Sequence, residues 1–301
     1  MEKPRRYELD PDDPRTSLRE HVIEALAAVV VHFDSTISIE GIEATDLFGM
    51  NSLLGGAIET QTVAVLNRMR DIWDPNDKYA CYEFRRYPES FPDVRLVHVD
   101  GGTPVIGIEL KGWYLLSKEG EPSFRFQASA NAISEYDLLV CYPWSLTNVI
   151  SGQPRLHAPY IEQAKYAADR RTYYWKTRRP PRAPKANYFD IEYPDTHPYP
   201  EPGSRYTDKP AQDGGGNFGR VGRFGIMDEF TEKSLAIPLA GIAARHWIDF
   251  LKLFAEGMTA PQIEQGIQRI GNTITESLAV ESDKVDAVLR HLQLAVEYIS
   301  H

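Results

Sequence analysis

The sequence predicts an α/β protein in which a mixed central β-sheet is flanked by helices and followed by a helical C-terminal region. Apolar residues recur at helical spacing up to residue 73, give way to short strand-like runs between residues 79 and 142, and return to helical spacing after residue 226. Of the 301 residues, 42% are apolar and 25% charged, which is an ordinary globular composition. A chain of this length can bury a large core.

Two helices are expected before the sheet. Residues 1–16 predict a polar lead-in, and a helix is expected to follow from Thr16 or Ser17, either of which can cap its first turn. A second helix is expected over residues 51–73. It ends before Pro75, because proline disfavours helical geometry in the residue that precedes it.

The strands of the predicted sheet are short runs rich in β-branched and aromatic residues, bounded by Gly, Pro and Asp. They are expected at residues 79–86, 94–99, 105–116, 124–127 and 138–142. A turn over Asp100–Thr103 is expected to join the second strand to the third. A short helix is expected over residues 128–136, before the last strand.

The rest of the chain predicts mostly helices. Residues 17–180 are expected to form the core, including a basic helix over residues 159–175. Residues 181–225 are rich in Pro, Gly, Tyr and Asp and predict a long loop. Residues 226–301 predict a helical region that packs on the core as one domain. Its helices are expected at residues 228–256, 260–270 and 281–300.

Composition and motifs exclude several classes of protein. Cys81 and Cys141 have no Cys or His neighbours at metal-ligand spacing, which argues against a disulfide scaffold or a zinc module and predicts a reducing compartment. The N-terminus lacks the apolar stretch of a signal peptide, and no apolar run predicts a membrane span, so a cytoplasmic protein is expected. The glycine-rich run 214–220 lacks the Gly-Lys-Ser/Thr of a P-loop, so no ATP-dependent activity is expected.

The segment that carries chemistry is Pro92-Asp93, followed after fifteen residues by Glu109-Leu110-Lys111. Alternate residues of a strand share a face, so Glu109 and Lys111 are expected to project together. A hairpin loop of three or five residues would place Asp93 opposite Lys111 and diagonal to Glu109. Two neighbouring carboxylates and the Leu110 carbonyl suit Mg²⁺, with Mn²⁺ as a substitute. Lys111 could then orient an attacking water, which predicts hydrolysis of a phosphodiester.

The pattern P-D-x15-E-L-K resembles that of the PD-(D/E)xK nuclease superfamily, which includes most type II restriction endonucleases. The resemblance covers about residues 59–142 and implies a restriction-endonuclease-like core. It also implies that Asp93 and Glu109 are metal ligands and that Lys111 is the catalytic lysine. Many members carry a further acidic residue on a helix before the sheet. The best match for this supporting acid is Glu59, with Glu83 and Glu89 as alternatives, while Asp100 is an alternative first acid.

A basic segment predicts contact with nucleic acid. The net charge of the chain is −10, yet residues 151–185 hold nine Lys or Arg and two acidic residues. Aromatic residues alternate with the cations, as is typical of surfaces that bind phosphates and bases, although cations at a solvated helix end give the same pattern. Contacts with double-stranded DNA are expected from Arg170, Arg171, Tyr174, Trp175, Lys176, Arg178, Arg179 and Arg182.

These observations together predict a Mg²⁺-dependent DNA endonuclease, either a site-specific type II restriction enzyme or a related phage-defence nuclease. Cutting both strands of a symmetric site favours a homodimer, with the C-terminal helices as its interface. Two alternatives stay open. One is a DNA-binding or assembly subunit that keeps a nuclease fold without cutting, and the other is a structure-specific repair nuclease.

Overall fold

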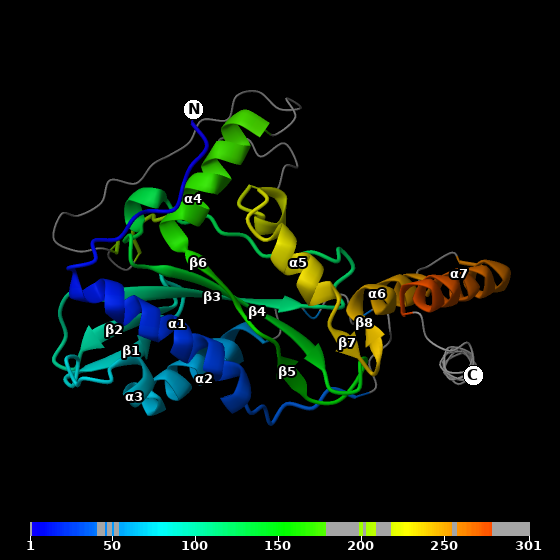
Figure 1. Ribbon diagram of the computed structural model, residues 1–301, viewed down its shortest axis with the longest axis horizontal. Helices are drawn as coiled ribbons and strands as arrows, with labels where there is room; N and C mark the ends of the chain where they lie inside the picture. The colour runs from blue at the N-terminus through cyan, green and yellow to red at the C-terminus, as the bar shows by residue number, and fades with distance from the viewer. Residues whose placement is uncertain are drawn as a thin grey trace.

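A mixed six-stranded β-sheet lies at the centre of the computed structural model, with helices on both of its faces (Figure 1). The structure describes residues 2–40, 46, 50, 54–178, 199–200, 203–208, 218–254 and 258–278. This arrangement confirms the predicted α/β class, because both parallel and antiparallel strand pairs occur in one sheet.

The strands run in the order β1-β2-β3-β4-β5, and β6 is a second partner of β4. Their bounds are Tyr82–Arg86 for β1, Val94–His98 for β2, Ile106–Tyr114 for β3, Leu138–Leu146 for β4, Pro154–Leu156 for β5 and Tyr160–Gln163 for β6. The first three strands form an antiparallel meander, and β4 lies parallel to β3. β6 and β5 pair with successive parts of β4 on its other edge. All nine residues of β4 are buried, because this strand has neighbours on both edges and helices above and below.

The helices that precede the sheet in the chain and the helix that follows its last strand lie on different faces of the sheet (Figure 1). Their bounds are Pro14–His32 for α1, Gly55–Arg68 for α2, Arg70–Trp73 for α3, Ala164–Tyr173 for α4, Asp228–Leu235 for α5, Ala244–Lys252 for α6 and Ala260–Leu278 for α7. The first three cover one face, where the Tyr142 hydroxyl of β4 donates to the Leu26 carbonyl of α1 at 2.9 Å. Helix α4 lies over the other face. Among the described residues, no helix is both long enough and apolar enough to cross a membrane.

Several expected boundaries near the N-terminus and in the sheet are corrected. Helix α1 begins at Pro14 and is capped by Asp13, whose carboxylate accepts from the Arg15 N–H, so the expected caps Thr16 and Ser17 lie inside the helix. In place of the expected strand 124–127, Arg125 forms an isolated bridge with Arg220, and a second isolated bridge, Ala128–Thr207, lies just beyond it. The expected helix 128–136 is reduced to one short turn, η2, over Ala130–Ala132.

The C-terminal half also differs from expectation in two places. The expected helix 159–175 begins as strand β6, because its first residues pair with buried β4 before α4 starts. The expected helix 228–256 is interrupted by a small hairpin, β7 (Pro238–Leu239) and β8 (Ile242–Ala243). Its two turn residues, Ala240 and Gly241, both have positive φ, which suits a tight hairpin turn and ends a helix. The expected helix 281–300 and most of the expected loop 181–225 lie outside the described residues.

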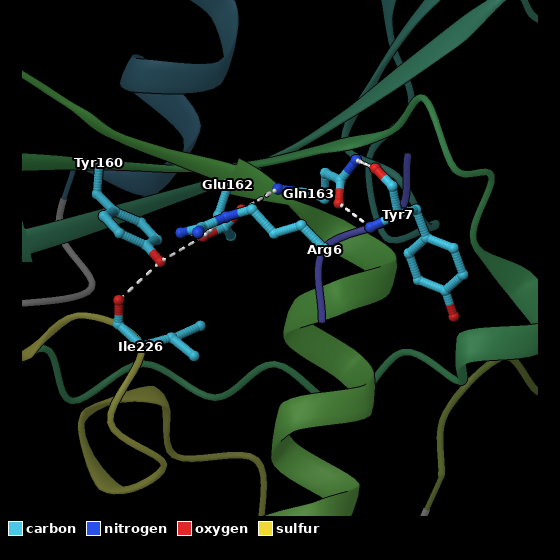
Figure 2. Close-up of polar contacts among 6 residues, drawn as sticks. All are labelled: Arg6, Tyr7, Tyr160, Glu162, Gln163 and Ile226. Carbon is cyan, nitrogen blue, oxygen red and sulfur yellow. Dashed lines mark hydrogen bonds and ion pairs between the residues drawn. The ribbon is translucent and has the colours of Figure 1, made fainter. Parts of the chain in front are cut away.

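The N-terminal arm, residues 2–10, is attached to β6 and α4 by polar contacts, and Figure 2 shows those with β6. The Arg6 guanidinium forms an ion pair of 2.7 Å with Glu162, whose side chain is only 5% exposed. The Gln163 side-chain amide accepts from the Tyr7 N–H at 2.8 Å and donates to the Tyr7 carbonyl at 2.9 Å. The Tyr7 hydroxyl donates to Asp169 of α4 at 2.6 Å. These bonds satisfy two buried polar side chains of β6 that would otherwise lose their contacts with water.

Gly107 of β3 allows a very close approach between the sheet and the segment that covers it. A Cβ atom at this position would overlap the Tyr199 hydroxyl and the Pro92 ring. The same Tyr199 hydroxyl donates to the buried Asp137 carboxylate at 2.6 Å, and the Gly107 N–H donates to that carboxylate at 2.8 Å. Only glycine leaves room for this arrangement.

Gly107→Ala is therefore expected to lower the free energy of unfolding by about 1–3 kcal/mol, the usual cost of overpacking a tight core. Urea denaturation followed by circular dichroism would measure the loss. Gly55→Ala is the matched control, because a Cβ there meets no atom within 4 Å. Equal stability of the Gly107→Ala and wild-type proteins would contradict the close packing described here.

Candidate active site

Strand β3 brings Glu109 and Lys111 to one face of the sheet, as predicted. Gly112 of β3 faces Ile58 of α2. Successive residues of a strand point to opposite faces, so Glu109 and Lys111 project to the face on which α4 lies. Asp93 comes one residue before β2. The register pairs Val94 with Ile108, which places Asp93 level with Glu109 and corrects the expectation that it lies opposite Lys111.

The three charged side chains nevertheless meet. The Lys111 Nζ lies 2.7 Å from the Glu109 Oε1 and 3.5 Å from the Asp93 Oδ2. The Asp93 Oδ2 also accepts from the Leu110 N–H at 2.8 Å, which fixes the carboxylate against the edge of β3. The side chains of Asp93, Glu109 and Lys111 are 17%, 13% and 21% exposed. The cluster is thus largely withdrawn from water while one side remains open to it.

The electrostatics of this cluster are those of two carboxylates that share one ammonium. Burial, followed by the negative charge of Glu109, raises the pKa of Asp93 to about 7, although Lys111 acts to lower it. Burial alone would lower the pKa of Lys111, but the charges of Glu109 and Asp93 outweigh it and raise the pKa above its ordinary value. Lys111 therefore stays protonated at neutral pH, and the cluster carries one excess negative charge whenever both carboxylates are ionised.

The donor atoms fit a divalent cation. The Glu109 Oε2 is buried and has no hydrogen-bond partner among the described residues, which is a costly state for a carboxylate oxygen. The N–H and C=O of one strand residue point to the same edge, so the Leu110 carbonyl faces the edge where Asp93 lies. The described residues contain no group of three or more His, Cys, Asp or Glu placed to hold a metal. This donor set suits Mg²⁺, which typically takes one or two carboxylates and completes its shell with water and phosphate oxygens.

The three acids considered for the supporting role lie in different surroundings. Glu59 lies on α2 and its carboxylate accepts from the Arg86 Nε at 2.7 Å. Its negative charge contributes to the raised pKa of Asp93, after burial and the charge of Glu109. Glu83 is paired with Arg85 on β1, and Glu89 is exposed in the turn before β2. Asp100, the alternative first acid, has a side chain that is 88% exposed.

The basic segment divides into internal and exposed residues. Arg171 is only 1% exposed and forms a buried ion pair with Asp208. The expectation that it contacts DNA is therefore wrong, because its guanidinium is bound inside the fold. Trp175 is buried against the edge of the Phe218 ring. The remaining expected contacts fall into three groups: Arg170 and Tyr174 are half-buried, Lys176 and Arg178 are exposed, and Arg179 and Arg182 lie outside the described residues.

Tyr206 is a residue near the site that the sequence did not indicate. Its pKa is raised by burial and then by the charges of Glu109 and Asp93, which places its phenol in the field of the carboxylates. The sequence carries no periodic signal at this position, because Tyr206 lies in a stretch rich in Pro, Gly and Tyr.

Comparisons of the chain with models of protein families, with curated proteins and with solved structures found no match. Function must therefore be inferred from the chemistry of this chain's own residues. Their main feature is a half-enclosed patch on which two carboxylates, one ammonium and one unsatisfied carboxylate oxygen converge.

Proposed function

We propose that this protein is a Mg²⁺-dependent endonuclease that hydrolyses phosphodiester bonds in double-stranded DNA, and that it is a PD-(D/E)xK nuclease of the type II restriction or phage-defence kind. The observation that carries the proposal is the convergence of Asp93, Glu109 and Lys111, with a buried Glu109 oxygen that lacks a partner. A structural ion pair needs one carboxylate for one ammonium. A second buried carboxylate adds repulsion and is explained by a cation that binds both.

Each residue of the patch has a role in this proposal. Asp93, Glu109 and the Leu110 carbonyl would hold Mg²⁺, which lowers the pKa of water and offsets charge on the phosphate. Lys111 is held at the patch by both carboxylates and stays protonated, so it acts as a hydrogen-bond donor and not as a general base. Its ammonium can orient the attacking water and stabilise charge that develops on the phosphoryl oxygens.

Binding of the duplex would use cations around the patch. Lys176 and Arg178 are exposed where α4 continues into a single π-helical turn, Tyr174–Arg178, and can neutralise phosphates. A homodimer would allow both strands of a symmetric site to be cut. In the described part of α6 and α7 the isoleucines Ile267, Ile270 and Ile274 are buried within the chain itself. The site of dimerisation therefore remains a prediction.

The direct test incubates the purified chain with phage and plasmid DNA in Mg²⁺, beside an EDTA control and the Lys111→Ala variant. We expect discrete fragments from the wild type, none in EDTA, and a rate lowered at least about 10²-fold in Lys111→Ala, the scale of losing one charge-stabilising donor. Lys233→Ala is the matched control, because Lys233 is 73% exposed and pairs with Glu229 on the same helix.

The possible outcomes distinguish the proposed nuclease from the alternative functions. Cutting that survives Lys111→Ala would place the active site elsewhere. Binding of DNA without any cutting would favour the non-cleaving subunit. Preferential cutting of nicked or branched DNA over intact circular DNA would favour a structure-specific repair nuclease over a restriction enzyme.

A further inference from the structure

Tyr206 lies beside the candidate active site on an aromatic support. Its ring stacks on that of Phe91, with 5.8 Å between the centroids and 27° between the planes. Phe91 is 2% exposed and lies two residues before Asp93 in the chain. Tyr206 is thereby positioned against the same short segment that presents the first carboxylate.

The backbone around Tyr206 is held by a short antiparallel bridge. The Ser129 N–H donates to the Tyr206 carbonyl at 2.8 Å, and the Asp208 N–H donates to the Gln127 carbonyl at 2.9 Å. Ala128 and Thr207 are the bridged pair between these two bonds. A residue held on both sides by backbone bonds loses little further entropy when it contacts a ligand.

A buried ion pair fixes this bridge to α4. The Arg171 guanidinium forms its ion pair with the Asp208 carboxylate, and both side chains are at most 4% exposed. The Arg171 Nη1 also donates to the Ala128 carbonyl at 2.8 Å and to the Phe126 carbonyl at 3.3 Å. Arg171 thus ties together the two segments that hold Tyr206 in place.

The ring and the backbone of Tyr206 have structural contacts, but its hydroxyl has none of the same kind. It makes no hydrogen bond with any described residue, and it is not fully buried. The neighbouring Tyr199 differs, because its hydroxyl is occupied by the Asp137 carboxylate. A phenol that is held rigidly near two carboxylates and an ammonium, and keeps its donor available, is arranged to meet a polar group of a ligand.

We propose that the Tyr206 hydroxyl donates a hydrogen bond to a non-bridging oxygen of the phosphate that is cut. This inference rests on the proposed nuclease function and adds a substrate contact to it. No bond to tyrosine forms and its proton stays on the phenol. The hydrogen bond strengthens as negative charge grows on the phosphoryl oxygens, so it stabilises the transition state more than the bound substrate. The raised pKa of Tyr206 keeps the phenol protonated at neutral pH.

The test is Tyr206→Phe in the full chain, which removes the hydroxyl and keeps the ring that stacks on Phe91. We expect the single-turnover cleavage rate in Mg²⁺ to fall about 10- to 100-fold. We expect the Kd for the same duplex, measured in EDTA, to stay within about twofold of wild type, since the effect lies in the transition state. Tyr199→Phe is the matched control: it removes a phenol from the same aromatic group and is expected to cut at the wild-type rate at a temperature where it is folded.

The outcomes distinguish this inference from the function on which it rests. A wild type that cuts and a Tyr206→Phe variant that cuts equally fast would overturn the role of Tyr206 and leave the nuclease proposal intact. A loss that appears in the Kd alone, with the rate unchanged, would also overturn it, because the contact would then be one of ground-state binding. A wild type that cuts no DNA in Mg²⁺ would overturn the proposed function, and the Tyr206 contact with it.

Discussion

Asp93→Asn is expected to lower DNA cleavage by more than about 10³-fold and, at the same time, to raise the melting temperature of the metal-free protein. Loss of activity follows because one of two carboxylates that would hold Mg²⁺ is gone. The gain in stability follows because Asp93 and Glu109 are largely buried and share the single ammonium of Lys111. Removing one charge relieves a repulsion on the order of 1 kcal/mol, while the asparagine oxygen can still accept from the Leu110 N–H.

Thermal unfolding with and without Mg²⁺ measures both halves of this prediction. The wild-type melting temperature is expected to rise in Mg²⁺, because a ligand that binds the native state stabilises it, and the variant should lose most of that rise. Asp100→Asn is the matched control, since its carboxylate is 88% exposed in the turn after β2. A metal-free Asp93→Asn protein that is less stable than wild type would show that Asp93 has a structural role and no repulsive one.

Asp208→Asn is expected to lower the free energy of unfolding by about 3–5 kcal/mol, the usual cost of leaving one member of a buried ion pair without its partner. The Arg171 guanidinium would keep its charge inside the fold, where its side chain is 1% exposed. Arg171→Met is expected to cost a similar amount, because it also leaves the Ala128 carbonyl without its donor at 2.8 Å.

Urea denaturation of both single variants and of the double variant Arg171→Met/Asp208→Leu would measure how strongly the pair is coupled. The double variant is expected to lose less stability than the sum of the single losses. Glu229→Ala is the control, because its ion pair with Lys233 is exposed to solvent and contributes little to stability. Additive losses in the double variant would mean that Arg171 and Asp208 stabilise the fold independently.

The meander β1–β3 and the parallel strand β4 were predictable because their apolar runs are bounded by clear turn residues. The C-terminal half was harder. The apolar spacing of residues 228–256 is helical, and only the local preference of the Ala240-Gly241 turn separates one helix from two helices and a hairpin. Strand β6 was missed for a related reason: its four residues acquire strand geometry by pairing with β4, which no local pattern reveals.

The prediction that Asp93 shares a face with Glu109 and Lys111 needed only an odd number of residues in the loop between β2 and β3, and not the exact register. The loop between the paired residues Leu96 and Ile106 is longer than expected, yet it still contains an odd number of residues. Asp93 therefore kept its face while it moved two positions along β3, from Lys111 to Glu109. Arg171 could not be assigned in this way. Its partner Asp208 lies 37 residues further on, in an irregular segment, so no local pattern indicates that this arginine is buried.

The N-terminal arm has a consequence for how the chain folds as it is made. Arg6 and Tyr7 leave the ribosome before their partners Glu162 and Gln163, which follow 156 residues later. At about 5–20 residues per second, the arm waits roughly 10–30 s before its binding surface exists. The arm is thus synthesised long before it can be placed, and docking of the arm reports that β6 and α4 have already formed.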